Sequence, residues 1–184
     1  MTTTELSPAA QAHLNTSDIA PITEDLLTRV LEPYSHKGCR YLRTASYKAT
    51  ETSMFSLGTF AIAESSYIRS TGHFNAAEMM VCFNQIAYSA FAPAILNEQI
   101  PPFRGWSIED YFDHQLPSML IKNFSARFSR PINAAGFSAR LWCEDFEVVD
   151  RTWRYLRIPC TIEFWDADGG FASGEVELAA LNIP

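Results

Sequence analysis

The stretch of sequence that decides the fold spans residues 73–97 and reads HFNAAEMMVCFNQIAYSAFAPAILN. It carries no charged residue from Met79 to Asn97, and its apolar residues fall on nearly every face of a helix. Such a helix either crosses a membrane or lies at the centre of a soluble fold. Asn84 and Gln85 interrupt the apolar run, which barely reaches the ~20 residues that a bilayer requires. The stretch therefore predicts a buried central helix with a sheet wrapped around it.

The start of this helix carries the residues best suited to chemistry. Asn75 fits an N-cap, and Glu78 stands three residues later, as in a capping box. The free N–H groups and the positive dipole end of a buried helix can stabilise a developing oxyanion. His73 and Glu78 are placed to move protons beside it. The simpler alternative is that Asn75 and Glu78 only cap the helix.

Length and composition indicate one globular domain. The chain has 184 residues, is 47% hydrophobic and has a formal net charge of −7, which argues against nucleic-acid binding. Residues 1–21 are small and polar and predict a flexible arm, so we expect a single domain over residues 22–184. The N-terminus lacks the basic region and apolar core of a signal peptide. We therefore expect a cytoplasmic protein without a membrane partner.

The cysteines and histidines give no sign of a metal or a disulfide. Four cysteines are scattered without a CxxC pair and predict buried, reduced thiols. Four histidines show no spacing typical of metal ligands. We expect neither a metal nor another cofactor.

Half of the 14 lysines and arginines fall in one segment, as Lys122, Arg127, Arg130, Arg140, Arg151, Arg154 and Arg157. Alternating strands can gather several of them into a basic rim for a phosphate or an acidic partner. The alternative is a set of dispersed surface charges.

Local patterns predict the other elements. Helices are predicted at residues 23–31, before a connector at 34–39, and from the capping box at 107–110 to about residue 115. Strands are predicted at 40–48 and 53–63 before the central helix, and at 119–130, 137–149, 152–166 and 171–181 after it, with a break near Pro159 and a hairpin turn at 168–170. This order makes an α+β hotdog fold, an antiparallel sheet wrapped around one long central helix. Single hotdog protomers usually leave a sheet edge and the helix end open, so we expect a homodimer or a higher even-numbered homo-oligomer.

Two runs of sequence also resemble a known family. ESSYIRSTGHFN at residues 64–75 and CFNQIAYSAFAP at 82–93 are similar to the mycobacterial long-chain acyl-CoA thioesterase family of the hotdog fold. The likeness extends to further segments at 31–42, 104–111, 151–155 and 177–184. It covers nearly the whole chain after the first 20 residues.

The resemblance implies two alternative activities. Relatives in actinobacterial secondary-metabolite pathways, those of isonitrile lipopeptides and macrolactams, resemble the thioesterases but add glycine to a (2E)-enoyl thioester. The amine attacks the β-carbon and leaves a 3-(carboxymethylamino)acyl chain on an acyl carrier protein. The resemblance also implies a set of pocket residues, namely Tyr34, Tyr67, Asn75, Asn84 and Tyr88.

The two chemistries need different parts. Hydrolysis needs a carboxylate or a positioned water beside the carbonyl, and Glu78 fits that role. No Gly-x-Ser-x-Gly motif is present in the sequence, so an acyl-enzyme is not expected. Glycine addition needs a polarised carbonyl at the helix start around Asn75. It also needs a base, for which Glu78 or His73 is the candidate, and an acid for the α-carbon, for which His73 or Tyr67 is the candidate.

The glycine carboxylate needs a cation, and Arg69 is nearest in sequence, with Arg43 as a second candidate. Structural alternatives exist for each residue: His73 as a satisfied histidine, Arg69 as a surface or dimer-interface charge, and Tyr88 as plain core. At ~100° per residue, Asn84 and Tyr88 lie roughly opposite Asn75 on the helix. They are not expected to share one small pocket with Asn75 in one protomer.

We therefore expect a lyase-type hotdog enzyme that adds glycine to an enoyl thioester on an acyl carrier protein, with CoA as the alternative carrier. The expected catalytic residues are Glu78, His73, Tyr67 and Asn75, and the expected substrate-binding residues are Tyr34, Arg69, Asn84 and Tyr88. The alternatives are a long-chain fatty acyl-CoA thioesterase and a non-catalytic acyl-chain binding module.

Overall fold

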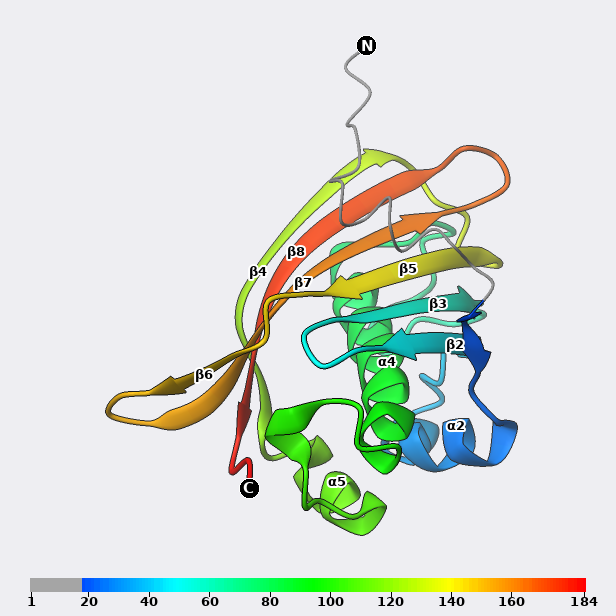
Figure 1. The fold of residues 1–184 in the computed structure, drawn as a ribbon. Coiled ribbons are helices and arrows are strands. Elements are labelled where there is room, and N and C mark those ends of the chain that lie inside the picture. Colours follow the sequence, from blue (N-terminus) through cyan, green and yellow to red (C-terminus); the bar gives the residue numbers. More distant parts are fainter. Residues whose placement is uncertain (1–17) are drawn as a thin grey trace.

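The computed structural model describes residues 18–184, which form one antiparallel sheet curled around a long helix (Figure 1). The strand order is β1-β2-β3-β5-β7-β8-β4, with β6 paired to β7 off this path. The strands are β1 (Ala20–Pro21), β2 (Leu42–Ala49), β3 (Met54–Phe60), β4 (Met119–Arg130), β5 (Phe137–Cys143), β6 (Glu147–Asp150), β7 (Arg154–Trp165) and β8 (Phe171–Leu181). The helices are α2 (Glu24–Val30), α3 (Glu32–Ser35), α4 (Ala76–Leu96), the 3₁₀ turn η2 (Pro101–Phe103) and α5 (Ile108–Gln115). The predicted α+β hotdog fold is confirmed.

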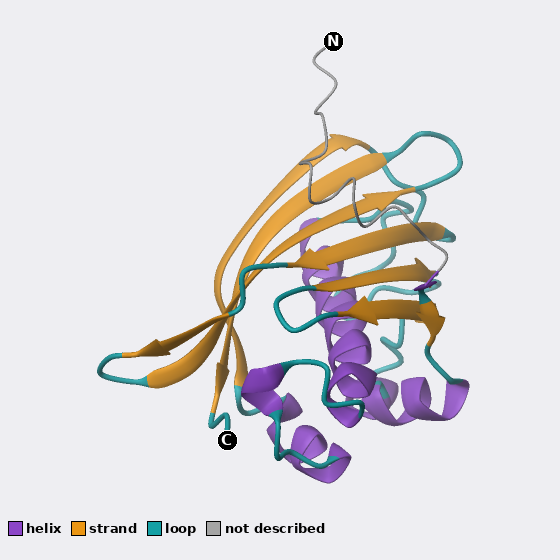
Figure 2. Ribbon diagram, in the orientation of Figure 1, coloured by secondary structure: helices purple, strands orange, loops and turns teal. Residues whose placement is uncertain are grey.

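Helix α4 lies in the hollow of the sheet (Figure 2). Met79, Phe83 and Phe91 are fully buried at different angles around its axis, as the charge-free sequence predicts. Of the described helices, α4 is the one long and apolar enough to cross a membrane, but 78% of its most apolar window is buried inside the protein. It is the core helix of a soluble fold.

The long strands show why this sequence makes a one-sided sheet. Burial alternates along β7 and β8, so every second side chain points towards α4. Ile158, Ile162 and Phe164 of β7 are all fully buried. The hairpin that joins β7 to β8 turns at Gly169, whose φ of 83° favours glycine. The hairpin predicted at residues 168–170 is confirmed.

Two details of the predicted sheet are wrong. The segment 137–149 is two strands, because β5 ends at Cys143 and β6 begins at Glu147. The segment 152–166 has no break near Pro159, since β7 is continuous and Pro159 lies where its partner changes from β5 to β6. Proline lacks an N–H to donate, and at this point the neighbouring strand has ended. Pro159 therefore marks the gap between β5 and β6, the strands that pair with β7, and not a break in β7 itself.

The N-terminal part departs from the prediction in two places. Ala20 and Pro21, assigned to the arm, pair with β2 at its edge. Tyr34 lies in the helical turn α3 and not in a connector, because Pro33 occupies the first turn of that helix, where it is tolerated. The rest of the predicted arm, residues 1–17, lies outside the described residues, and the division of the chain remains a prediction.

Helices α2 and α5 cover only one end of α4 (Figure 1). Tyr111 of α5 donates to the Tyr88 carbonyl of α4 at 2.7 Å, and Gln115 donates to the Val30 carbonyl of α2 at 2.9 Å. The first contact joins α5 to the C-terminal half of α4, and the second joins α5 to α2. The N-terminal end of α4 meets the sheet and the irregular segment 61–75, and that is where the predicted site residues gather.

Candidate active site

The helix start is closed by the predicted capping box. The Asn75 Oδ1 atom accepts the N–H groups of Ala77 at 3.0 Å and Glu78 at 3.2 Å, while Glu78 Oε2 accepts the Asn75 N–H at 3.2 Å. The capping role is therefore real. It does not exclude catalysis, because the box leaves two donors without an acceptor among residues 18–184, the Ala76 N–H and the Asn75 side-chain Nδ2.

Tyr67 reaches the same point from the irregular segment before the helix. Its hydroxyl donates to Asn75 Oδ1 at 2.9 Å, so this oxygen accepts three hydrogen bonds. An amide oxygen so occupied fixes the orientation of the whole side chain, which turns Nδ2 away from the helix. Tyr67 itself is 53% exposed, and its ring is available to a ligand.

Glu78 is a buried carboxylate at this helix start. It is 3% exposed, and the Asn75 N–H is the one hydrogen-bond donor to it found within residues 18–184. It lies one turn before Cys82, whose pKa is raised first by burial and then by the Glu78 charge. A desolvated carboxylate with spare acceptor capacity is a suitable general base.

An apolar cleft of about 390 Å³ opens beside the cap. It is lined by His73, Phe74, Asn75 and Ala76 from the helix start and by residues 128–131 from the end of β4. The Phe74 ring closes its inner wall against Phe137 and Phe164, at centroid distances of 4.7 and 4.8 Å. His73 is exposed, and its backbone bridges to Asn133. Hydrogen bonds therefore join Tyr67, Asn75 and Glu78 at the helix start, and His73 lines the cleft beside them, whereas Tyr67 and Glu78 are not among the residues that line the cleft.

Tyr34 and Tyr88 form a second group farther along α4. Burial raises the pKa of Tyr34, and the neighbouring Tyr88, Cys39 and Cys82 raise it further. Burial likewise raises the pKa of Tyr88. Ten residues separate Tyr88 from Glu78, about 15 Å along a helix. Tyr88 is therefore displaced along the helix from the Asn75 end, and Cys82 lies between the two groups. That Asn84 and Tyr88 face away from Asn75 stays a prediction.

The structure does not bring Arg69 and Asn84 into either group. Arg69 is exposed and has no ion pair among residues 18–184. Asn84 is half-buried, and no hydrogen bond to its side chain is found in the described part of the chain. Arg43 is engaged elsewhere, since it donates to the Ala61 carbonyl.

Sequence reasoning missed residues that come from far along the chain. Phe128 and Arg130 line the cleft from β4, and Tyr41 holds the segment that carries Tyr67. The sequence predicted a strand at residues 119–130, but nothing local indicates which end of that strand meets the helix start.

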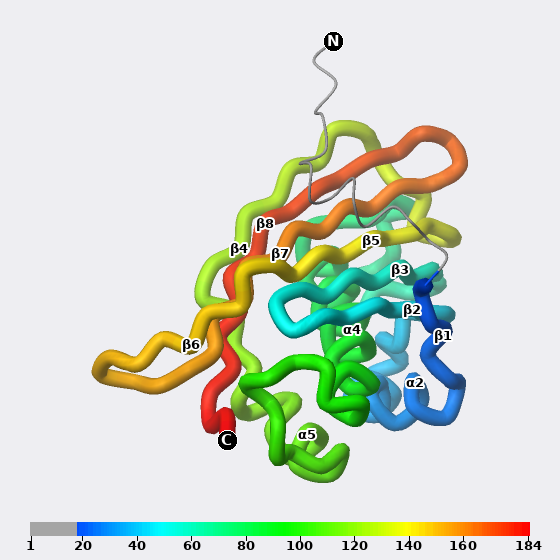
Figure 3. The backbone as a smooth tube through the Cα atoms, in the orientation of Figure 1, coloured from blue at the N-terminus to red at the C-terminus, as the bar shows by residue number. Residues whose placement is uncertain are grey.

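Three of the seven cations of the predicted basic rim pair with carboxylates, and Arg154 donates to the backbone oxygens of Ile183 and Pro184. Lys122 and Arg157 pair with Glu177, and Arg140 pairs with Glu163. Arg127, Arg130 and Arg151 have no carboxylate partner within residues 18–184. Arg151 lies at the tip of the β6–β7 hairpin, which projects from the body of the molecule (Figure 3). The seven cations therefore do not form one continuous patch.

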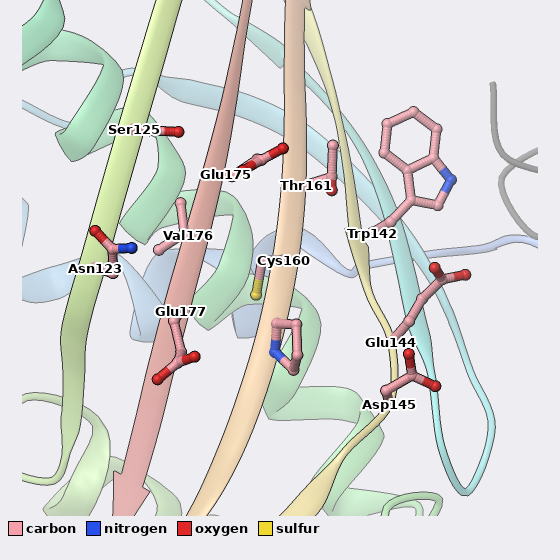
Figure 4. Close-up of a pocket in the computed structure, with 11 residues that line it drawn as sticks. Asn123, Ser125, Trp142, Glu144, Asp145, Cys160, Thr161, Glu175, Val176 and Glu177 are labelled. Atoms are coloured by element: carbon pink, nitrogen blue, oxygen red, sulfur yellow. The ribbon is translucent and has the colours of Figure 1, made fainter. Parts of the chain in front are cut away.

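A different hollow, of about 300 Å³, lies on the face of the sheet away from α4 (Figure 4). Its side chains include Trp142, Thr161 and Glu175, which alternate with residues that point towards the helix. None of the predicted site residues lines it. The hollow carries the carboxylates of Glu144, Asp145, Glu175 and Glu177, whereas the predicted catalytic residues lie at the start of α4, on the other side of the sheet.

The curled sheet, its central helix and the cleft over the helix start define a protein of the hotdog thioesterase class. Comparison with known proteins agrees with this class. The chain belongs to the FcoT-like thioesterase family, because the model of the FcoT-like thioesterase domain matches residues 29–180.

Similar proteins carry a more specific name. A (2E)-enoyl-[ACP] glycyltransferase of Mycobacterium marinum is 65% identical over 184 residues, 100% of both chains. A protein of the same name from Mycobacterium tuberculosis is 63% identical over 184 residues, also 100% of both chains. Another from Streptomyces coeruleorubidus is 37% identical over 166 residues, 88% of this chain and 98% of that one.

Among solved structures, the Escherichia coli PaaI protein from the phenylacetic acid degradation operon covers 88% of this chain and 97% of its own. Its TM-score is 0.41 at 10% sequence identity. This similarity is too distant to say anything about the site.

Proposed function

We propose that this protein adds glycine to a (2E)-enoyl thioester on an acyl carrier protein. The amine forms a bond to the β-carbon, and the product is a 3-(carboxymethylamino)acyl thioester whose C–S bond stays intact. The observation that carries the proposal is the capping box itself, in which the buried Glu78 carboxylate accepts the Asn75 backbone N–H while the Asn75 side-chain N–H₂ has no acceptor among residues 18–184. The full-length likeness to proteins named (2E)-enoyl-[ACP] glycyltransferase supports this choice of substrates.

The donors at the helix start would polarise the thioester carbonyl. Attack at the β-carbon moves negative charge onto the thioester oxygen, so donors that already point there lower the barrier. Asn75 Nδ2 and the Ala76 N–H are the two donors left free by the capping box. The positive end of the α4 dipole adds to their effect.

Two proton transfers complete the reaction. Glu78 accepts a proton from the amine of glycine, and the enolate then takes a proton at the α-carbon from His73 or Tyr67. His73 lines the cleft and Tyr67 contacts Asn75, so both lie beside the proposed carbonyl position. Arg69 is the proposed anchor of the glycine carboxylate, because it is exposed, has no ion pair among residues 18–184 and follows Tyr67 by two residues.

The acyl chain would run along α4 from the cleft towards Tyr34 and Tyr88. Tyr88 is buried, and burial raises the pKa of both tyrosines. Asn84 is the polar group proposed to meet the chain or its head on that side of the helix.

The partners follow from this chemistry. The carrier presents a phosphate, as CoA does, and Arg127, Arg130 and Arg151 are the cations of the basic segment left unpaired within the described residues. We also propose a cytoplasmic homodimer or higher even-numbered homo-oligomer, because β4 is an edge strand of 12 residues.

The test is mass spectrometry of the acyl carrier after incubation with a medium-chain (2E)-enoyl group, with and without glycine. An acyl thioester heavier by one glycine, formed only with enzyme, supports the proposal. The family description favours one competing function, hydrolysis of a long-chain acyl-CoA with Glu78 activating water. Release of the free acid at a rate independent of glycine would support that function and contradict ours.

A further inference from the structure

We infer that Tyr41 is a positioning residue that holds Tyr67 against Asn75. The Tyr41 hydroxyl accepts the Ser66 N–H at 2.9 Å and donates to the Glu64 carbonyl at 3.3 Å. One hydroxyl thus ties down the backbone on both sides of Ser65, immediately before Tyr67. The inference rests on the proposed function, in which Tyr67 and Asn75 act on the thioester.

Tyr41 is itself fixed to the central helix. Its side chain is 2% exposed, and its backbone N–H donates to Gln85 Oε1 of α4 at 2.9 Å. Gln85 is fully buried and also accepts the Leu42 N–H at 2.9 Å and donates to the Cys39 carbonyl at 2.6 Å. The start of β2 is therefore locked to α4 by a single amide side chain.

These contacts form a continuous series of hydrogen-bonded residues that begins and ends on α4. It runs from Gln85 through Tyr41 to the segment 64–66, then through Tyr67 to Asn75 at the helix start. The segment between β3 and α4 forms no regular helix or strand, and Tyr67 is half exposed, so packing alone does not fix it. The two hydrogen bonds of the Tyr41 hydroxyl therefore hold the backbone of residues 64–66, which has no helix or strand hydrogen bonds to hold it.

The test is a double-mutant cycle of Tyr41→Phe and Tyr67→Phe, with Tyr47→Phe as the matched control. Tyr47 is also a buried tyrosine, within β2, and its hydroxyl accepts from Asn97 at the opposite end of α4. We expect Tyr41→Phe to lower kcat for glycine addition about 3- to 10-fold, the effect of one hydrogen bond, with the KM of glycine unchanged. In the Tyr67→Phe background it should have less than about a twofold effect, because coupled residues are not additive.

Independent effects of the two substitutions, or wild-type kcat in Tyr41→Phe, would overturn the inference. Hydrogen exchange provides a readout that needs no activity. Tyr41→Phe should speed exchange in the peptide containing Ser66 and leave α4 protected, whereas unchanged exchange there would also overturn the inference. Failure of the proposed function is seen separately, as wild-type enzyme that adds no glycine while the exchange difference persists.

Discussion

Asn75 combines two roles that are usually separate. Its Oδ1 atom accepts three hydrogen bonds, two of which cap α4. Its Nδ2 has no acceptor among residues 18–184, and the residue lines the cleft. A capping side chain is ordinarily replaceable by another cap. Here only an amide supplies both the acceptor and the donor.

Asn75→Asp separates the two roles. Aspartate caps helices as well as asparagine does, so we expect an unchanged melting temperature. The donor is lost and a negative charge faces the developing enolate, so kcat should fall about 100- to 1,000-fold. Thermal unfolding and steady-state kinetics measure the two effects, and a variant that retains activity would remove Asn75 from the proposed chemistry.

Glu78→Gln tests the general base. Glutamine keeps the shape and an acceptor for the Asn75 N–H, but it cannot take a proton, so we expect kcat to fall about 100- to 10,000-fold. Asp110→Asn is the matched control, because Asp110 closes the capping box of α5 by accepting the Ser107 N–H at 2.7 Å. Equal losses of activity in the two variants would mean that Glu78 acts only through helix capping.

Arg69→Ala tests the carboxylate anchor. Loss of a charge-assisted hydrogen bond should raise the KM of glycine about tenfold or more, with a smaller effect on the KM of the enoyl substrate. Arg104→Ala, which removes an exposed cation paired with Glu51, serves as the control. Equal changes in both KM values for Arg69→Ala would count against the anchor.

At the residue scale, the sequence predicted Tyr67, His73, Asn75 and Glu78 as neighbours because they lie within 12 residues of one another around a helix start. Tyr41 was out of reach of that reasoning. Its role depends on a hydroxyl that bonds a backbone 25 residues away, and nothing around Tyr41 in the sequence distinguishes it from a core tyrosine.

At the scale of elements, α4 and β8 approach closely at Gly174. A Cβ added there would lie 2.8 Å from Met79 Cε and 2.9 Å from the Ser125 carbonyl oxygen. The close approach seats the first turns of α4, including Glu78, against the sheet.

Gly174→Ala should therefore lower the free energy of unfolding by about 1–3 kcal/mol, the usual cost of overpacking. Gly136→Ala is the control, since a Cβ there meets nothing within 4 Å and should leave stability unchanged or slightly raised. Denaturant unfolding compares the two. Equal stability of both variants would contradict the close packing described here.

Most elements could be predicted because their signals are local. The charge-free run defined α4, the capping box defined α5, and alternation defined β7 and β8. Pro159 was misread because the meaning of a proline in a strand depends on what its neighbouring strand does, and that pairing lies outside any local window.

At the scale of the molecule, Asp166 links the strands near the cleft. Its Oδ2 atom accepts the Asn133 N–H at 2.7 Å, and its Oδ1 atom accepts the Gly170 N–H at 2.7 Å. The hydrogen bond from Asn133, followed by those of the 166–170 turn, lowers the pKa of Asp166 below its ordinary value of 3.8. Asn133 in turn bridges to His73.

A carboxyl group whose pKa is lower in the folded state than in the unfolded state stabilises the protein at any pH above the unfolded-state pKa. This stabilisation is lost as the pH falls through the folded-state pKa. We therefore expect Asp166→Asn to be less stable than the wild type above pH 3.8, with the difference shrinking under more acidic conditions. Urea unfolding across this range measures it. A difference that grows as the pH falls would contradict the assigned hydrogen bonds.

The whole fold follows from one feature that is visible in the sequence. Helix α4 is apolar on nearly every face and must be buried on every side. A curled sheet is the simplest cover for it, and that architecture was predicted. The cleft was not, because it needs the end of β4, more than 50 residues after the helix start, to lie beside His73 and Phe74.

The most direct test of the account is the intact mass of an enoyl-loaded acyl carrier protein after reaction with isotopically labelled glycine, for the wild type and Glu78→Gln. We predict that the wild type attaches one labelled glycine to the acyl group, with the thioester intact, and that Glu78→Gln does so far more slowly. A wild-type protein that releases free enoic acid and leaves the label in solution would contradict the account.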